Sequence, residues 1–259
     1  MLQTAIEAAK RAGQVIAERY PAGRNATFKG YRDLVTDTDV AAEAVILDLI
    51  RARFPDHAIL AEEGGGDEAH GDYVWVVDPL DGTTNYAHHV PVFCTSIGVL
   101  ERCQPIIGVI HDPLREQTFV AERGKGATFN GEPIHASATS RLIHSVVGLD
   151  WGHSDEVRGQ TLDLLLQIAP RCGTVRALGS AALALAYVAA GWLDAYFNLS
   201  LKPWDTAAGT LLVAEAGGRC TTLKGEPFCV GVPTCLATND LIHDPLLAVM
   251  CDTEAGSGR

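Results

Sequence analysis

With 259 residues, 47% of them hydrophobic and 20% charged, the chain can bury a large core and lies near the upper size of a single domain. Its formal net charge of −12 argues against a general nucleic-acid binder, because phosphate backbones are held by clustered Lys and Arg. An anionic substrate is not excluded, since bound divalent metal ions can invert the local charge.

Two helices are predicted to open the chain. Residues 1–20 place apolar side chains at helical spacing and lack the apolar core of a signal peptide, so they predict an amphipathic helix. A second helix is predicted over 38–55, with Thr38 or Asp39 as its cap and Pro55 closing it.

A glycine-rich acidic loop over 61–72 separates the second helix from the first clear strand. Aromatic and β-branched residues predict that strand over 73–79, where Pro79 stops it. Short β-like runs over 91–134, separated by Gly, Pro and charged turns, then predict an antiparallel sheet.

From Ala136 onwards, predicted helices and strands alternate, which indicates a second sheet covered by helices. The uncharged, alanine-rich span 177–193 falls short of a bilayer crossing and predicts a buried helix, so we expect no membrane partner. The tail at 254–259 is predicted to be disordered. The predicted fold is an α/β (α+β) sandwich layered α-β-α-β-α, with an N-terminal half over 1–135 and a C-terminal half over 136–259.

Seven cysteines form an odd, scattered set without a CxxC pair, namely Cys94, Cys103, Cys172, Cys220, Cys229, Cys235 and Cys251. Most are flanked by apolar or small residues, which favours free, buried thiols in a reducing compartment over a zinc site or a disulfide framework. The predicted location is therefore cytoplasmic.

The stretch WVVDPLDGTTNY, residues 75–86, brings two aspartates to the end of the predicted strand. Pro79 fixes its own φ and biases Asp78 towards an extended conformation, so a turn there can aim Asp78 and Asp81 into one space. Two unpaired carboxylates would repel each other, and a hard divalent cation such as Mg²⁺, which prefers oxygen ligands, removes that cost. The alternative is an acidic turn that only caps the next helix.

Gly82, Thr83 and Thr84 follow at once, and a helix is predicted to begin near Thr84 or Asn85. Backbone N–H groups at such a helix start, with no side chain at Gly82 to obstruct approach, form an anion site. A metal pair beside an anion site suits a phosphate monoester better than it suits a metal store.

Other acidic residues stand in segments with two interpretations. Glu62 and Glu63 precede glycines that would let a loop fold inward, although such a pair alone is more often solvated surface. Asp205, Asp37 and Asp39 are candidate ligands, although each taken alone is more often a helix cap.

Four segments decide between these interpretations, and they are DLVTDTD (33–39), LAEEGGG (60–66), WVVDPLDGTTNY (75–86) and KPWDTAAGTLLVAEAGG (202–218). In this order they resemble the signature segments of the inositol monophosphatase family, whose members are magnesium-dependent, lithium-sensitive phosphatases. The stretch RALGSAALALAYVAAGWLDAY (176–196) is similar to the family's segment before its last metal aspartate. The resemblance extends from Lys29 to about Gly218, and the two aspartate motifs in combination are highly specific.

The resemblance implies two or three Mg²⁺ ions per site. Glu62, Asp78 and the backbone carbonyl of Leu80 would hold the first ion. Asp78, Asp81 and Asp205 would hold the second, so that Asp78 bridges the two. A third, weaker ion would rest mainly on Glu62 and water.

The same resemblance places the catalytic groups. The N–H groups of Gly82 and Thr83 would bind the phosphate, and Thr83, with Asp39 and Glu62, would orient the attacking water. Phosphate monoesters resist hydrolysis because an anion repels its nucleophile, so positive charge and a positioned water are what the site must supply. No covalent phosphoenzyme is required.

Substrate contacts would come from the C-terminal half, at Gly179, Ser180 and Asn198. Family members that act on inositol phosphates commonly carry a glutamate where this chain, counted back from Asp205, has Asn198. Asparagine can donate and accept hydrogen bonds but lacks charge, which changes polyol preference unless the substitution is neutral.

The resemblance implies a homodimeric enzyme that hydrolyses myo-inositol monophosphate. Relatives in the same superfamily cleave fructose 1,6-bisphosphate, histidinol phosphate or adenosine 3′,5′-bisphosphate instead. The nucleotide phosphatases usually carry a lysine where this chain has Thr84, which disfavours that substrate. A noncatalytic, regulatory binding protein is the alternative of another class.

Three further residues keep two interpretations each. His88 and His89 follow the expected phosphate site and predict an exposed helical pair near the rim of the cleft, with substrate contact as the alternative. Lys29 resembles a family lysine on a mobile segment near the metals, and an ordinary surface lysine fits equally well.

Overall fold

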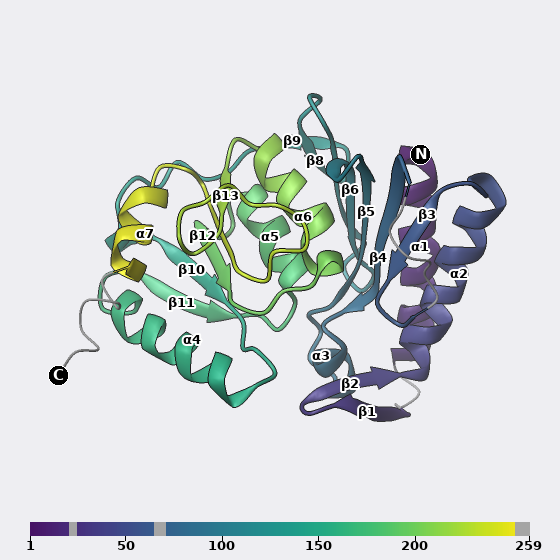
Figure 1. The fold of residues 1–259 in the computed structure, drawn as a ribbon, viewed down its shortest axis with the longest axis horizontal. Helices are drawn as coiled ribbons and strands as arrows, with labels where there is room; N and C mark the ends of the chain where they lie inside the picture. The colour runs from purple at the N-terminus through teal and green to yellow at the C-terminus, as the bar shows by residue number, and fades with distance from the viewer. Residues whose placement is uncertain (21–24, 65–70, 252–259) are drawn as a thin grey trace.

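The computed structural model describes residues 1–20, 25–64 and 71–251, so the tail predicted to be disordered lies outside the described residues. Five layers follow one another across the molecule, two helices on the outside, a large sheet, two helices, a smaller sheet and two further helices (Figure 1). This order confirms the predicted α-β-α-β-α fold.

The large sheet has seven strands in sequence order, and its neighbours are antiparallel except for the parallel pair β3 and β4. The antiparallel sheet predicted over 91–134 is therefore confirmed. The strands are β3 (Ala58–Ala61), β4 (Tyr73–Asp81), β5 (Cys94–Glu101), β6 (Gln104–Asp112), β7 (Gln117–Glu122), β8 (Ala127–Phe129) and β9 (Glu132–Ile134).

The smaller sheet has the strand order β11-β10-β12-β14-β13, with β10 parallel to both of its neighbours and the other pairs antiparallel. Its strands are β10 (Val146–Leu149), β11 (Thr174–Ala177), β12 (Ala195–Asn198), β13 (Arg219–Thr221) and β14 (Cys235–Thr238). Each sheet comes from one half of the chain, but a single apolar cluster joins residues of both sheets through the helices between them. The division at residue 135 remains a prediction.

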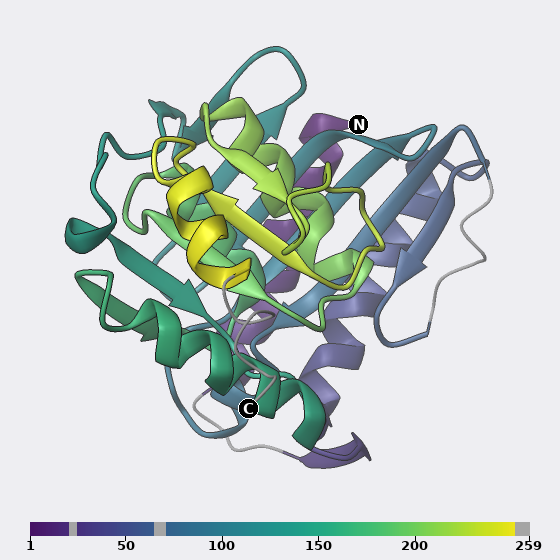
Figure 2. The ribbon, with the colours of Figure 1, turned by 60° about the vertical axis from the view of Figure 1, so that its left-hand side comes forward.

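In the part of the chain that the structure describes, six longer helices form the three helical layers, with α4 and α7 on the outer face of the smaller sheet (Figures 1 and 2). From one side to the other they are α1 (Leu2–Arg19) and α2 (Asp37–Arg53), then α5 (Ala181–Ala189) and α6 (Pro203–Glu215), then α4 (Asp155–Ile168) and α7 (His243–Cys251). A short helix, α3 (Thr83–Ala87), follows β4. A hairpin of β1 (Ala26–Gly30) and β2 (Asp33–Thr36) precedes α2.

The first helix has the predicted amphipathic pattern. Ala5, Ala8, Ala12 and Ile16 recur at intervals of three or four residues and are fully buried in the cluster against the large sheet. Small side chains on this face let the helix lie close to the strands.

The start of α2 differs from the prediction. Thr36 is the N-cap, and its hydroxyl accepts hydrogen bonds from the backbone of Thr38 and Asp39. Asp39 in turn accepts from the Thr36 backbone N–H at 2.9 Å, which completes a capping box. The prediction of Thr38 or Asp39 as cap is therefore wrong, because the hydroxyl two residues upstream reaches both N–H groups. The helix ends before Pro55, as predicted.

The alanine-rich span 177–193 contains the predicted buried helix, which covers Ala181–Ala189, while Ala177 ends strand β11. Eight of the nine residues of α5 are buried between the two sheets. In the part of the chain that the structure describes, no helix combines the length and apolar character that a membrane crossing requires.

The helix α6 lies unusually close to the large sheet. A Cβ at Gly98 would lie 2.6 Å from the Cβ of Ala207, and one at Gly108 would lie 2.6 Å from the carbonyl oxygen of Ala208. Real Cβ atoms do not approach other atoms so closely, so both strand positions require glycine. The two glycines thereby fix the position of α6, whose first turn carries Asp205.

All seven cysteines are free, but their burial is mixed. Cys94, Cys172 and Cys235 are buried as expected. The expectation of burial is wrong for Cys103, Cys229 and Cys251, which are exposed because they lie in a turn, in a loop and at the end of the last helix.

Candidate active site

Three aspartates from distant parts of the chain meet at one end of the large sheet. Asp78 and Asp81 end β4, and Asp205 lies in the first turn of α6. One carboxylate oxygen from each lies within 4.8 Å of those of the other two. Asp78 and Asp81 are buried, and Asp205 is partly buried.

An irregularity in β4 aims the first two aspartates. Residues three apart on a regular strand face opposite sides of a sheet. The pairing of β4 with β5 shifts register between Asp78 and Asp81, and the backbone around Pro79 departs from the ladder. The carboxylate of Asp78 accepts the Leu80 N–H at 3.0 Å, and the Thr95 hydroxyl donates to the Pro79 carbonyl at 2.9 Å. The turn predicted from the sequence is thus held by one hydrogen bond within it and by one from the neighbouring strand β5.

The second aspartate lies at the N-terminus of α5. Asp81 Oδ2 accepts hydrogen bonds from the Ser180 hydroxyl at 2.5 Å and from the Ala182 N–H at 2.7 Å. The Ala181 N–H lies 3.3 Å from Oδ1. Asp81 therefore accepts the first N–H groups of a helix whose N-cap is Ser180, and this helix belongs to the other half of the chain and not to the next turn.

Glu62 lies beside this cluster and carries an ion pair. Lys29 from β1 places its Nζ 2.7 Å from Glu62 Oε1 and 2.6 Å from Glu63 Oε1. Of the two interpretations of Lys29, the structure therefore favours the lysine near the site over an ordinary surface lysine.

The carboxyl groups of the cluster have raised pKa values, because they are buried close to one another. Burial raises the pKa of Asp78 well above its usual value, and the charges of Glu62 and Asp81 raise it further. Burial and the charge of Asp81 likewise raise the pKa of Asp205. Burial raises the pKa of Glu62 to about 7, although Lys29 acts in the opposite direction. Carboxylate oxygens gathered this tightly are the donor set that a hard divalent cation prefers, so the residues fit such an ion.

The residue after Asp81 leaves no space for a side chain. Gly82 has φ of +100°, and a Cβ there would lie 2.9 Å from the Val92 carbonyl oxygen and 3.1 Å from that of Gly179. It is the N-cap of α3, which begins at Thr83, one residue before the predicted start. The first N–H groups of this helix therefore lie next to the acidic cluster.

Thr83 and Asp39 form a hydrogen-bonded pair at the same place. The Thr83 hydroxyl lies 2.8 Å from Asp39 Oδ1 and 3.0 Å from the Leu80 carbonyl oxygen, and either can accept its proton. Burial raises the pKa of Asp39, while hydrogen bonds from Thr36 and Thr83 lower it. Asp39 thus belongs both to the capping box of α2, whose N-cap is Thr36, and to the site.

A sequence model of the inositol monophosphatase family matches residues 1–254. The chain belongs to the inositol monophosphatase family. Phosphatase IMPL1, chloroplastic, of Arabidopsis thaliana is 41% identical over 256 residues, covering 95% of this chain and 69% of that protein. Nus factor SuhB of Escherichia coli is 40% identical, covering 97% of this chain and 96% of that protein. The inositol monophosphatase structure from Anabaena is 39% identical with a TM-score of 0.87, covering 97% of this chain and 95% of that one.

Membership fixes the general class of chemistry. The inositol monophosphatase family consists of metal-dependent phosphatases that act on small phosphate esters, and the acidic cluster of this chain is consistent with that class. The relatives carry two kinds of name, phosphatase and Nus factor, so membership alone does not select a substrate or exclude a nucleic-acid partner.

Of the three expected substrate residues, two lie at the acidic cluster and one does not contact it directly. Ser180 contacts Asp81, and the carbonyl of Gly179 lies against Gly82, so both belong to the site. Within the described residues, the hydrogen bonds of the Asn198 side chain go to Tyr196 and Ser200 and not to an acidic ligand candidate. The family glutamate position is therefore connected to the site of this chain only indirectly.

Two residues near the site were not predicted. Asn85 donates to the carbonyl oxygens of Val92 and Leu178, both at 2.8 Å, and so joins the two halves of the chain. Asp150 accepts the Gly179 N–H at 2.6 Å. The signal available for Asp150 was its place just after a strand of the second predicted sheet, since ligand sites of α/β sheets gather at the carboxyl ends of strands.

The two histidines that follow α3 are exposed, as predicted, but they are not helical. His88 is the C-cap of α3, and His89 has φ of +57° with its ring 5.2 Å from that of Tyr20. Their substrate contact stays a prediction.

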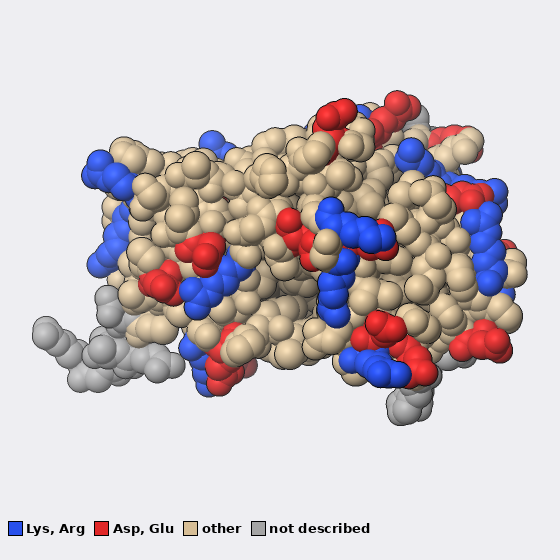
Figure 3. Space-filling model, turned by 90° about the horizontal axis from the view of Figure 1, so that it is seen from above, with Lys and Arg blue, Asp and Glu red and all other residues tan. Residues whose placement is uncertain are grey.

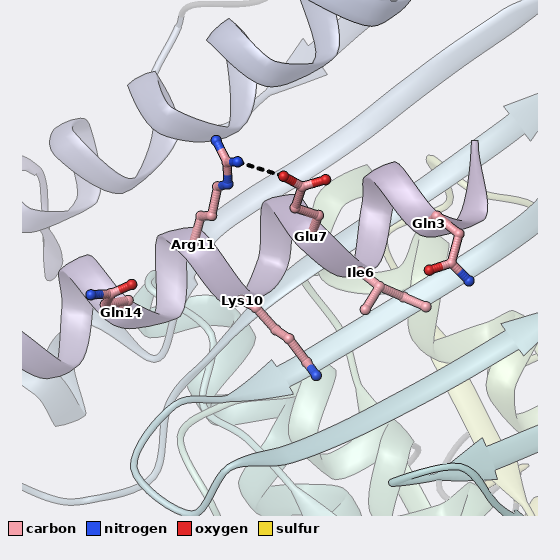
Figure 4. Close-up of a pocket in the computed structure, with 6 residues that line it drawn as sticks. All are labelled: Gln3, Ile6, Glu7, Lys10, Arg11 and Gln14. Carbon is pink, nitrogen blue, oxygen red and sulfur yellow. Dashed lines mark ion pairs between the residues drawn. The ribbon is translucent and has the colours of Figure 1, made fainter.

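Other surface features lie apart from the acidic cluster. A hollow on the outer face of α1 is formed by one helix only, with an ion pair of 2.5 Å between Arg11 and Glu7, and it holds no residue of the cluster (Figure 4). On the face shown in Figure 3, basic and acidic side chains are interspersed in small mixed groups between wide uncharged areas. That face therefore presents no continuous basic patch for a phosphate backbone.

Proposed function

We propose that the chain is a magnesium-dependent phosphatase that hydrolyses myo-inositol monophosphate or a closely similar sugar phosphate. The observation that carries this proposal is the meeting of Asp78, Asp81 and Asp205 within 4.8 Å beside the start of α3. Buried acids with raised pKa values next to backbone N–H donors are the arrangement that a cation and a phosphate together would satisfy.

The ligand set is proposed residue by residue. Glu62, Asp78 and the Leu80 carbonyl would hold one Mg²⁺, and Asp78, Asp81 and Asp205 a second, with a weaker third ion near Glu62. When bound, such ions supply positive charge to the phosphate and lower the pKa of water. The Lys29 ammonium 2.7 Å from Glu62 shows that this carboxylate already attracts a cation.

The remaining chemistry falls to groups of the chain itself. The N–H groups of Gly82 and Thr83 would bind phosphate oxygens, and the requirement for glycine at 82 keeps this approach open. Thr83 would accept a hydrogen bond from the attacking water while donating its own proton to Asp39, 2.8 Å away. The short chain from water to Asp39 would thus orient the nucleophile.

The substrate is the least constrained part of the proposal. Asn198 brings no charge, so a sugar phosphate other than myo-inositol monophosphate is compatible, including fructose 1,6-bisphosphate and histidinol phosphate. Thr84, in place of the lysine of nucleotide phosphatases, disfavours adenosine 3′,5′-bisphosphate. Cytoplasmic location and a homodimer belong to the same proposal.

A second candidate is a regulatory binding role, either alone or beside catalysis. The relative named as a Nus factor in Escherichia coli supports it, since 97% of this chain aligns with that protein. A purely regulatory chain would not need its acidic cluster, so cation uptake separates the two candidates.

The test is a panel of phosphate esters assayed for released phosphate, with and without Mg²⁺, for the wild type, Asp205→Asn and Asp48→Asn. Asp48 is an exposed aspartate of α2 and serves as the matched control. We expect Asp205→Asn to lower kcat at millimolar Mg²⁺ by at least about 100-fold, and Asp48→Asn to change it less than about twofold. Full activity in Asp205→Asn, or no calorimetric uptake of Mg²⁺ by the wild type, would refute the proposed enzyme.

A further inference from the structure

Asp150 is a buried carboxylate to which the family resemblance assigns no function. It directly follows β10 and is 8% exposed. Among the ion pairs of the described residues, none includes Asp150. Its partners are neutral, namely the Gly179 N–H at 2.6 Å and the Tyr196 hydroxyl at 3.1 Å. Burial raises its pKa to about 7, so the fold keeps this group at a cost in stability.

A chain of hydrogen bonds runs from Asp150 to Asn198. The Tyr196 hydroxyl donates to Asp150 and accepts from Asn198 Nδ2 at 3.0 Å. Asn198 Oδ1 accepts the Ser200 N–H at 2.9 Å. Tyr196 is fully buried and Asn198 is 6% exposed, so the whole chain is held inside the protein. This chain of hydrogen bonds therefore fixes the orientation of the Asn198 amide at the end of β12.

The other partner of Asp150 belongs to the wall of the acidic site. This wall is the segment 178–180. The Leu178 carbonyl accepts from Asn85 at 2.8 Å, and the Ser180 hydroxyl donates to Asp81 at 2.5 Å. Between them, the Gly179 carbonyl lies against Gly82, where the phosphate is proposed to bind. The segment is thus clamped between Asp150 on one side and the cluster on the other.

We infer that Asp150 is a positioning residue that sets the selectivity of the site for the alcohol part of the ester. It does so by fixing segment 178–180 and the Tyr196–Asn198 pair, which lie on the side where this alcohol part rests. The inference rests on the proposed phosphatase function. Asp81 keeps donors from α5 that do not depend on Asp150, so cation binding is expected to be independent of it. The Gly179 N–H and the Tyr196 hydroxyl, by contrast, both donate to Asp150 itself.

The test compares the conservative variants Asp150→Asn and Tyr196→Phe with a control, Asp194→Asn. Asp194 is also a buried aspartate, 6% exposed, but it binds Ser137 and the Val146 N–H away from segment 178–180. Two esters are used, myo-inositol monophosphate and p-nitrophenyl phosphate, whose alcohol has no hydroxyls to recognise.

We expect Asp150→Asn and Tyr196→Phe to raise KM for the inositol ester by about tenfold, the effect of losing roughly one hydrogen bond, with KM for the aryl ester changed less than about twofold. The calorimetric Kd for Mg²⁺ should stay at the wild-type value in both. Asp194→Asn should lower Tm and leave the ratio of the two KM values unchanged.

The outcomes separate this inference from the proposed function. A wild type that hydrolyses neither of these esters nor any other ester of the panel refutes the phosphatase and this inference with it. An active wild type whose Asp150→Asn variant shows equal changes for both esters, or none, overturns the inference and leaves the phosphatase standing. If Asp150→Asn does not fold, Tyr196→Phe decides the question, since it removes one oxygen from the same chain of hydrogen bonds.

Discussion

Single residues in this site serve the fold and the site together. Asp39 completes the capping box of α2 and also accepts from Thr83. Asp205 accepts the Lys202 N–H at 2.7 Å at the start of α6 and also belongs to the acidic cluster. The two interpretations that the sequence left open, helix cap or site residue, are therefore compatible. A carboxylate has two oxygens, and each can serve one purpose.

Thr83 and Thr84 provide an internal comparison at this scale. Thr83 is partly buried and hydrogen-bonded to Asp39, whereas Thr84 is exposed. We predict that Thr83→Ala lowers kcat by about 100-fold because the attacking water loses its acceptor, while Thr84→Ala retains activity within about twofold. Steady-state kinetics at saturating Mg²⁺ measures both. Equal losses in the two variants would show that Thr83 does not orient the attacking water.

At the scale of elements, the position of α6 determines where Asp205 lies. Gly98 and Gly108 on adjacent strands admit the backbone of this helix to a distance that no side chain would allow. Filling this space with a side chain should therefore change cation binding at the acidic cluster as well as the free energy of unfolding.

We predict that Gly108→Ala lowers the free energy of unfolding by about 1–3 kcal/mol through overpacking, and weakens Mg²⁺ binding as α6 moves outward. Gly159→Ala is the matched control, because Gly159 is exposed on α4 with open space around it. That change should stabilise the helix by about 0.5–1 kcal/mol and leave Mg²⁺ affinity unaltered. Denaturant unfolding and calorimetry measure the two effects. Unchanged Mg²⁺ affinity in a destabilised Gly108→Ala would contradict the link to Asp205.

Elements with a strong local pattern could be predicted from the sequence, and those without one could not. The buried face of α1 and the strands of the large sheet follow from apolar spacing. The hairpin β1–β2 was missed because all five residues of β1 are exposed and show no alternation. The metal-binding role proposed for the motif around Asp78 could also be predicted from the sequence, because its candidate ligands lie within a few adjacent residues. A role for Asp150 could not be predicted in this way, because its partners Gly179 and Tyr196 are brought to it only by the parallel pairing of the smaller sheet.

Over the whole molecule, the acidic cluster couples stability to pH and to cations. A raised carboxyl pKa means that the folded chain keeps its proton to a higher pH than the unfolded chain does. For Glu62 this window runs from the ordinary value of 4.5 to about 7, and the pKa values of Asp78 and Asp205 are raised in the same direction. Within it the unfolded chain ionises first, so the free energy of unfolding of the metal-free protein falls as pH rises.

We predict that the Tm of the protein in excess chelator falls by roughly 5 °C or more between about pH 5.5 and about pH 8, and that saturating Mg²⁺ removes most of this fall. The ion binds the ionised carboxylates of the folded state only, so it offsets their repulsion where the proton no longer does. Thermal unfolding across this range, with and without Mg²⁺, measures the effect, and Glu62→Gln should flatten the metal-free curve because the residue no longer titrates. Asp150 also has a raised pKa but lies outside the proposed ligand set, so a small fall should remain at saturating Mg²⁺. Identical slopes with and without the ion would mean that these carboxylates do not share a cation.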